Sequence, residues 1–211
     1  MSKIPTVNFH LNDYVTFALN DALPIHLSDQ TFKVVQANTL ILNDFYFNQS
    51  ILTCYELKNE RHEIVHLTPF QFDEDEDETK LRITKAISPE ELAALFTQDQ
   101  QRLMLDPQQL NPQEKNYLAV DPARIPQTLK NWIARAYYAD FKENHIGTST
   151  YLDYDSKHKT NMNPDRLLAK HPSRNYVLFQ GDYGDFYLEV NAKNPQEVFA
   201  TIILDGSEID S

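Results

Sequence analysis

Residues 50–78 read SILTCYELKNERHEIVHLTPFQFDEDEDE. Residues 51–57 are rich in β-branched and aromatic side chains, residues 58–61 form a polar break, and residues 64–72 again favour strand. This order predicts two antiparallel strands joined by a hairpin loop. A run of acidic residues then follows the second strand.

The hairpin loop overlaps a short motif, His62-Glu63-Ile64-Val65-His66, which fits the pattern H-E-x-x-H. The motif resembles the active-site helix of the zincin metalloproteases. On an α-helix, residues i and i+4 share a face, so two imidazoles could hold one Zn²⁺ while the glutamate activates a metal-bound water. The resemblance implies a zinc-dependent metallohydrolase with His62 and His66 as ligands and Glu63 as the general base.

The residues around this motif favour a strand over a helix. In a strand, the two histidines would share a face but stand about 13 Å apart at ~3.3 Å per residue, too far for one metal ion. Pro69 would stop a helix soon after His66. No G-x-x-H extension follows to supply a third ligand. We therefore prefer the hairpin, with no cofactor, and keep the zinc site as the alternative.

The acidic run contributes half of the formal net charge of -12. Like charges at this density repel one another, so the run is expected to be a solvated loop. One interpretation is a connector that confers solubility. The other is a docking surface for a basic protein partner, because clustered negative charge speeds encounter with a positive surface. The candidate partner-binding residues are Asp73, Glu74, Asp75, Glu76, Asp77 and Glu78.

Composition limits the classes of function. With 41% hydrophobic and 11% aromatic residues, the chain of 211 residues has enough apolar surface to fold. A pI near 4.9 disfavours direct binding of nucleic acid or anionic membrane. The single cysteine, Cys54, suits a reducing compartment, and no stretch has the length of a transmembrane helix. We expect a soluble cytoplasmic protein.

The distribution of patterns along the chain predicts an α+β fold. The N-terminal third is expected to hold antiparallel strands and the middle two or three helices. A capping box at Ser88-Pro89-Glu90-Glu91 begins the first helix, over residues 89–104, and apolar periodicity predicts another over residues 126–141. Strands at residues 176–180, 186–190 and 198–204 then predict a C-terminal antiparallel meander. We expect one domain over residues 1–211, with a weak boundary at residues 73–79.

The sequence contains no serine elbow, P-loop, dinucleotide fingerprint or paired-cysteine metal site. We therefore expect a non-catalytic cytoplasmic binding protein that docks on a basic partner through its acidic surface. A bacterial immunity protein that inhibits a toxin such as a nuclease would fit this size and charge. The zinc-dependent metallohydrolase remains the alternative function.

Overall fold

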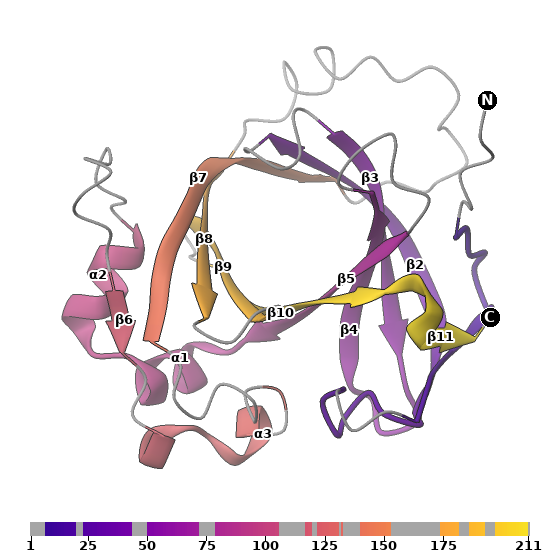
Figure 1. The fold of residues 1–211 in the computed structure, drawn as a ribbon, viewed down its shortest axis with the longest axis horizontal. Coiled ribbons are helices and arrows are strands. Elements are labelled where there is room, and N and C mark those ends of the chain that lie inside the picture. The colour runs from indigo at the N-terminus through magenta and orange to yellow at the C-terminus, as the bar shows by residue number, and fades with distance from the viewer. Residues whose placement is uncertain are drawn as a thin grey trace.

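The computed structural model describes residues 7–19, 23–43, 50–71, 79–105, 117–119, 122–130, 132, 140–152, 174–181, 186–192 and 197–210. In these residues, antiparallel strands dominate and form one continuous curled sheet (Figure 1). The strand order is β11-β1-β2-β3-β4-β5-β10-β9-β8-β7-β6. The strands are β1 (Tyr14–Phe17), β2 (Thr31–Asn43), β3 (Ser50–Lys58), β4 (Ile64–Phe70), β5 (Lys80–Ile87), β6 (Tyr117–Ala119), β7 (Asp140–Leu152), β8 (Arg174–Gly181), β9 (Phe186–Ala192), β10 (Glu197–Asp205) and β11 (Ile209–Asp210).

The long strand β2 belongs to two parts of the sheet. Its first residues pair with β1, and residues 39–43 pair with β7. A bulge between Val34 and Gln36 lies between these two parts, where the register against β3 shifts. The pairing of β7 with β2 closes the path through β3, β4, β5, β10, β9 and β8, which Figure 1 shows as a ring.

The predicted hairpin in residues 50–72 is confirmed. Strands β3 and β4 pair antiparallel, with Tyr55 opposite Leu67 and Lys58 opposite Ile64. Leu57, Val65 and Leu67 point into the core, as the alternation of apolar and polar residues along each strand requires.

The predicted α+β class is wrong. Three short helices, α1 (Pro89–Leu95), α2 (Gln98–Leu105) and α3 (Gln127–Lys130), are found in the described part of the chain, and they form no helical layer. The three C-terminal strands pair antiparallel in sequence order, but they do not form a separate unit, because β10 also pairs with β5 and β8 also pairs with β7. Long-range pairing therefore joins strands that the predicted fold placed in different regions of one domain.

Two of the predicted helices differ from the structure in detail. The capping box of Ser88 with Glu91 is present, but the helix ends at Leu95. Thr97 and Gln100 then form a second reciprocal cap that begins α2. The predicted helix over residues 126–141 is wrong at its end, because Phe141 lies in β7. Residues 133–139 lie outside the described residues.

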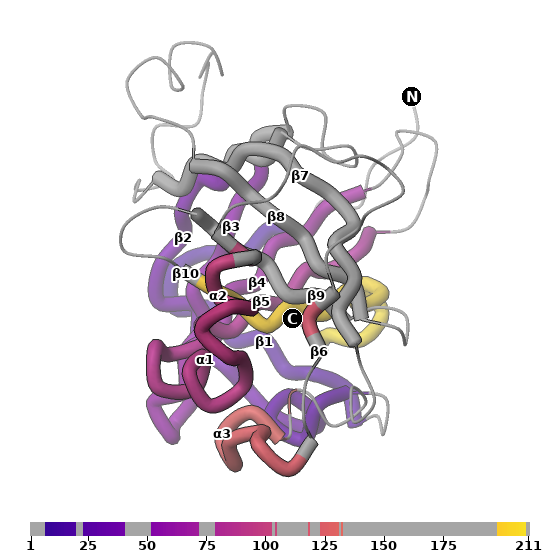
Figure 2. The backbone as a smooth tube through the Cα atoms, turned by 90° about the vertical axis from the view of Figure 1, so that its left-hand side faces the viewer, coloured from indigo at the N-terminus to yellow at the C-terminus, as the bar shows by residue number. Residues whose placement is uncertain are grey.

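The main core packs on one face of the six strands β1–β5 and β10. It also receives buried side chains from the helices, among them Leu92, Phe96 and Leu129. The helices α1, α2 and α3 gather on one side of the sheet, from the left to the bottom in Figure 1 and toward the viewer in Figure 2. The sheet and the helices thus share one core. Fully buried members include Phe17, Leu27, Phe32, Tyr55, Leu57, Leu67, Leu81 and Ile83.

Gly206 lies at a close contact that supports the start of β5. Its N–H donates a hydrogen bond of 2.8 Å to the carbonyl of Thr79, and a Cβ on residue 206 would lie 2.9 Å from that oxygen. We expect Gly206→Ala to lower the free energy of unfolding by about 1–3 kcal/mol, since the backbone must shift to relieve the overlap. Urea denaturation measures the loss, with Ser207→Ala as the control. Equal stability of the two variants would contradict the contact.

Candidate functional site

The turn between β3 and β4 is organised by Asn59, whose side chain is buried. Its Oδ1 accepts hydrogen bonds from the backbone N–H groups of Arg61 and Glu63, at 3.0 and 2.9 Å. His62 adopts a left-handed conformation with φ of 64°. Such a conformation is uncommon for a residue other than glycine, and here the hydrogen bonds of Asn59 hold the turn around it.

The Glu63 carboxylate connects this turn to the segment that contains His26. Its Oε2 accepts a hydrogen bond of 2.6 Å from Asn59 Nδ2, and its Oε1 lies 3.0 Å from Nδ1 of His26. Burial lowers the pKa of His26, and the nearby Lys85 and Arg61 lower it further, although Glu63 acts in the opposite direction. His26 is therefore neutral at pH 7, and its contact with Glu63 is a hydrogen bond.

The structure does not bring the residues of the H-E-x-x-H motif into the arrangement of a zinc helix. His62 is exposed in the turn, whereas His66 lies in β4 opposite Glu56. Glu63 carries the hydrogen bonds described above. Within the described ranges, no group of three or more His, Cys, Asp or Glu residues could hold a metal ion.

A change at Glu63 tests its structural role. We expect Glu63→Ala to lower the free energy of unfolding by about 1–2 kcal/mol, because Asn59 and His26 lose an acceptor. Chemical denaturation at pH 7 measures the change. Glu60→Ala removes an exposed carboxylate from the same turn and is expected to have an effect within about 0.5 kcal/mol. A larger loss for Glu60→Ala than for Glu63→Ala would contradict this role.

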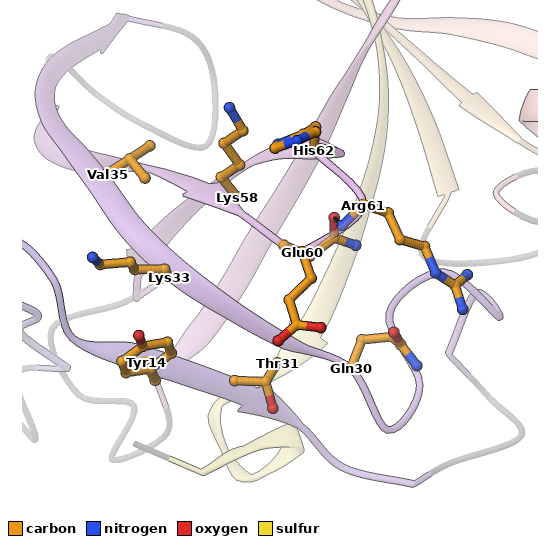
Figure 3. Close-up of a pocket in the computed structure, with 10 residues that line it drawn as sticks. Tyr14, Gln30, Thr31, Lys33, Val35, Lys58, Glu60, Arg61 and His62 are labelled. Atoms are coloured by element: carbon orange, nitrogen blue, oxygen red, sulfur yellow. Dashed lines mark hydrogen bonds between the residues drawn. The ribbon is translucent and has the colours of Figure 1, made fainter.

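A groove of about 620 Å³ lies beside the same turn, between the ends of β1, β2 and β3 (Figure 3). Its cationic side chains are Lys33 and Lys58, with Arg61 at the turn, and His62 also lines it. Polar groups capable of hydrogen bonding complete most of its lining. They come from Tyr14, Gln30, Thr31, Asn59 and Glu60.

A row of polar residues crosses the sheet on the face opposite the main core. Along the row each residue is the register partner of the next, from β2 through β3, β4 and β5 to β10. Neighbouring residues such as Ile83 and Ala200 point into the core, so the row must point the other way. The row consists of Gln36, Glu56, His66, Thr84 and Thr201.

Part of this row is deeply buried. Thr84 and Thr201 are 2% and 1% exposed. Among the described residues, Oγ1 of Thr201 is the one buried side-chain oxygen or nitrogen without a hydrogen-bond partner. An unsatisfied buried hydroxyl is uncommon in a folded protein because it loses its hydrogen bonds to water. Thr84 and Thr201 are therefore buried polar residues on this second face, which also carries an apolar cluster of Leu40, Cys54 and Phe70.

Arg82 adds a buried positive charge to this face. It is 6% exposed, and its Nη1 donates a hydrogen bond of 3.5 Å to Oγ1 of Thr68, its register partner. Burial lowers the pKa of His66 to about 4, and the Arg82 guanidinium contributes to the shift. His66 is therefore neutral at pH 7. Its contact of 3.9 Å with Glu56 is not an ion pair under these conditions.

The acidic residues 73–78 lie outside the described residues, but the strands that they connect are described. Phe70 of β4 pairs with Lys80 of β5. The N–H of Gly206 bonds to Thr79, and Lys80 forms an ion pair of 2.5 Å with Asp205. The chain on both sides of the run is thus fixed at one end of the sheet.

Sequence reasoning missed both the lysine groove and the buried polar row. The signal for the row was present in residues 80–87, KLRITKAI, where apolar residues alternate with Arg82 and Thr84. No comparable signal marks the groove. Lys33 and Lys58 are 25 positions apart, and only the register of β2 against β3 places them opposite each other.

Comparison with known proteins gives no match: no family model, curated protein or solved structure resembles the chain. No helix in the described part of the chain has the length and apolar character to cross a membrane.

Proposed function

We propose that this protein is a non-catalytic cytoplasmic binding protein that docks on a basic protein partner through Asp73–Glu78. The observation that carries the proposal is the concentration of half of the net charge of -12 in six consecutive residues. Clustered charge of one sign attracts an oppositely charged surface and raises the association rate. Inhibition of a toxin, as by an immunity protein, is the form of docking that we favour.

The positions of the flanking strands support this proposal. Phe70 of β4 pairs with Lys80 of β5, so the strands on both sides of the run are paired with each other. The partner surface that would fit is rich in Lys and Arg.

Comparative capture from a lysate of the cells that make the protein tests the proposal. The natural chain is compared at low salt with a variant in which Glu74, Asp75, Glu76 and Asp77 become the corresponding amides. We expect a basic protein to be retained by the natural chain and lost from the variant. Identical sets of retained proteins would contradict the proposal.

A matched control separates the role of the run from that of net charge. It converts four exposed carboxylates elsewhere, those of Asp29, Glu60, Glu90 and Asp99, to amides. This control changes the net charge by the same amount as the variant of the run. We expect it to retain the partner. Loss of the partner from both variants would show that net charge, and not the run, determines binding.

A further inference from the structure

The groove beside the β3–β4 turn contains two lysines that lie opposite each other on paired strands. Lys33 of β2 is the register partner of Lys58 of β3, and both line the groove. Residues directly opposite each other in an antiparallel pair have Cβ atoms about 5 Å apart. Rotation about the side-chain bonds would therefore bring both ammonium groups within reach of a single anion.

Two positive charges in this position are unfavourable without a counter-charge. Like charges directly opposite across two strands destabilise a sheet. Within the described ranges, neither Lys33 nor Lys58 forms an ion pair with a carboxylate. The protein has 31 acidic residues against 19 Lys and Arg, so most cations could have had an acidic neighbour.

Among the described residues that line the groove, Glu60 carries the one carboxylate, and it does not neutralise this pair. Figure 3 shows the carboxylate of Glu60 beside Thr31, while the ammonium groups of Lys33 and Lys58 point away from it. The same figure shows Arg61 pointing out of the groove. The lysine pair is thus the positive centre of the groove.

We propose that this groove binds the phosphate group of a small soluble molecule. A phosphate carries close to two negative charges and several acceptor oxygens, which matches two ammonium groups. Tyr14, which lies beside Lys33 in Figure 3, supplies a neutral hydroxyl donor on the same side of the groove. A volume of about 620 Å³ accommodates a molecule larger than phosphate itself. This binding is independent of the docking proposed for residues 73–78.

Titration of the full-length protein with pyrophosphate at low ionic strength tests this assignment. Two-dimensional amide NMR spectra follow the titration. We expect saturable shifts in residues 30–35 and 57–62. In the double variant Lys33→Gln, Lys58→Gln, we expect the affinity to fall at least about tenfold, since both charged donors to the anion are lost. Lys130→Gln removes one lysine in α3 and is expected to leave the affinity unchanged.

Three results would overturn the assignment. The first is the absence of saturable chemical-shift changes up to 10 mM pyrophosphate, a concentration that corresponds to about the weakest affinity of interest. The second is chemical-shift changes spread over the whole protein. The third is equal affinity for pyrophosphate in the natural chain and the double variant. The spectrum of the double variant also shows whether it is folded.

A second experiment, with lipid vesicles, distinguishes the phosphate of a soluble molecule from that of a lipid headgroup. Vesicles of phosphatidylcholine with phosphatidic acid present the same chemical group on an anionic surface. We expect the protein not to sediment with them, because its net charge of -12 is repelled by that surface. Sedimentation with the vesicles that is lost in the double variant would overturn the assignment to a soluble molecule.

Discussion

Between pH 7 and pH 4, the free energy of unfolding of the natural protein is expected to fall by about 3 kcal/mol more than that of His66→Gln. The cause is the difference in proton uptake between the folded and unfolded states. In the unfolded chain, His66 takes up a proton as the pH falls below its ordinary pKa of 6.5. In the folded protein, burial and Arg82 delay that uptake until the pH is about 4.

The direction of this effect follows from which state binds more protons. Between pH 6.5 and pH 4, the unfolded state binds the additional proton, so stability is present above this window and is lost as the pH falls through it. Other groups also titrate in this range, and they change the free energy of unfolding of the natural protein and of the variant by the same amount. Their contribution cancels in the difference.

Urea denaturation of dilute protein at several pH values measures this effect. His62→Gln removes one imidazole from the exposed turn and provides the matched comparison. If the free energy of unfolding changed with pH in the same way for the natural protein and His66→Gln over the whole range, the burial of His66 on the polar face would be contradicted.

Replacement of Arg82 by alanine is expected to lower the free energy of unfolding at pH 7 by about 3 kcal/mol. Thr68 loses its charged donor, and the buried stem of the arginine leaves a void. The pKa of His66 is expected to rise from about 4, because Arg82 is one of the two causes that lower it. NMR titration of the imidazole measures this second effect.

Arg102→Ala is the control for Arg82. Arg102 is 78% exposed in α2, where it forms an ion pair with Asp99 at 3.5 Å. Exposed ion pairs of this kind contribute little to the free energy of unfolding, so Arg102→Ala should change it by less than about 0.5 kcal/mol. An unchanged pKa of His66 in Arg82→Ala would contradict the proximity of the two groups on the polar face.

Local signals in the sequence were enough to predict individual elements of this protein. The β3–β4 hairpin follows from alternating β-branched residues around a polar break, and the N-terminus of α1 follows from the capping box at Ser88. Both depend on interactions between residues close in sequence. Their geometry is therefore encoded over a few positions.

The arrangement of these elements could not be predicted in the same way. The pairing of β10 with β5 joins Thr201 to Thr84, more than a hundred positions earlier. No local pattern specifies such a partner, because any strand with an apolar face could pair there. The α+β prediction failed at this level, where long-range pairing decides the fold.

The candidate sites differ in the same respect, because some are visible in the local sequence and others depend on long-range strand pairing. The acidic residues 73–78 are visible in the sequence because they are consecutive, and their role as a docking surface stays a prediction. The lysine pair and the polar row exist only in the register of the sheet. The H-E-x-x-H motif is the opposite case, because it is easily seen in the sequence but does not form a site. Its glutamate, Glu63, holds a turn through its contacts with Asn59 and His26.

The rate of association with the captured partner, measured as a function of salt concentration, tests the docking proposal most directly. For the natural chain we expect fast association that slows steeply with added salt, since long-range attraction is screened. Neutralising Glu74, Asp75, Glu76 and Asp77 should lower the rate at low salt about tenfold or more and flatten its dependence on salt. The same rate and the same salt dependence in both chains would contradict docking through the acidic run.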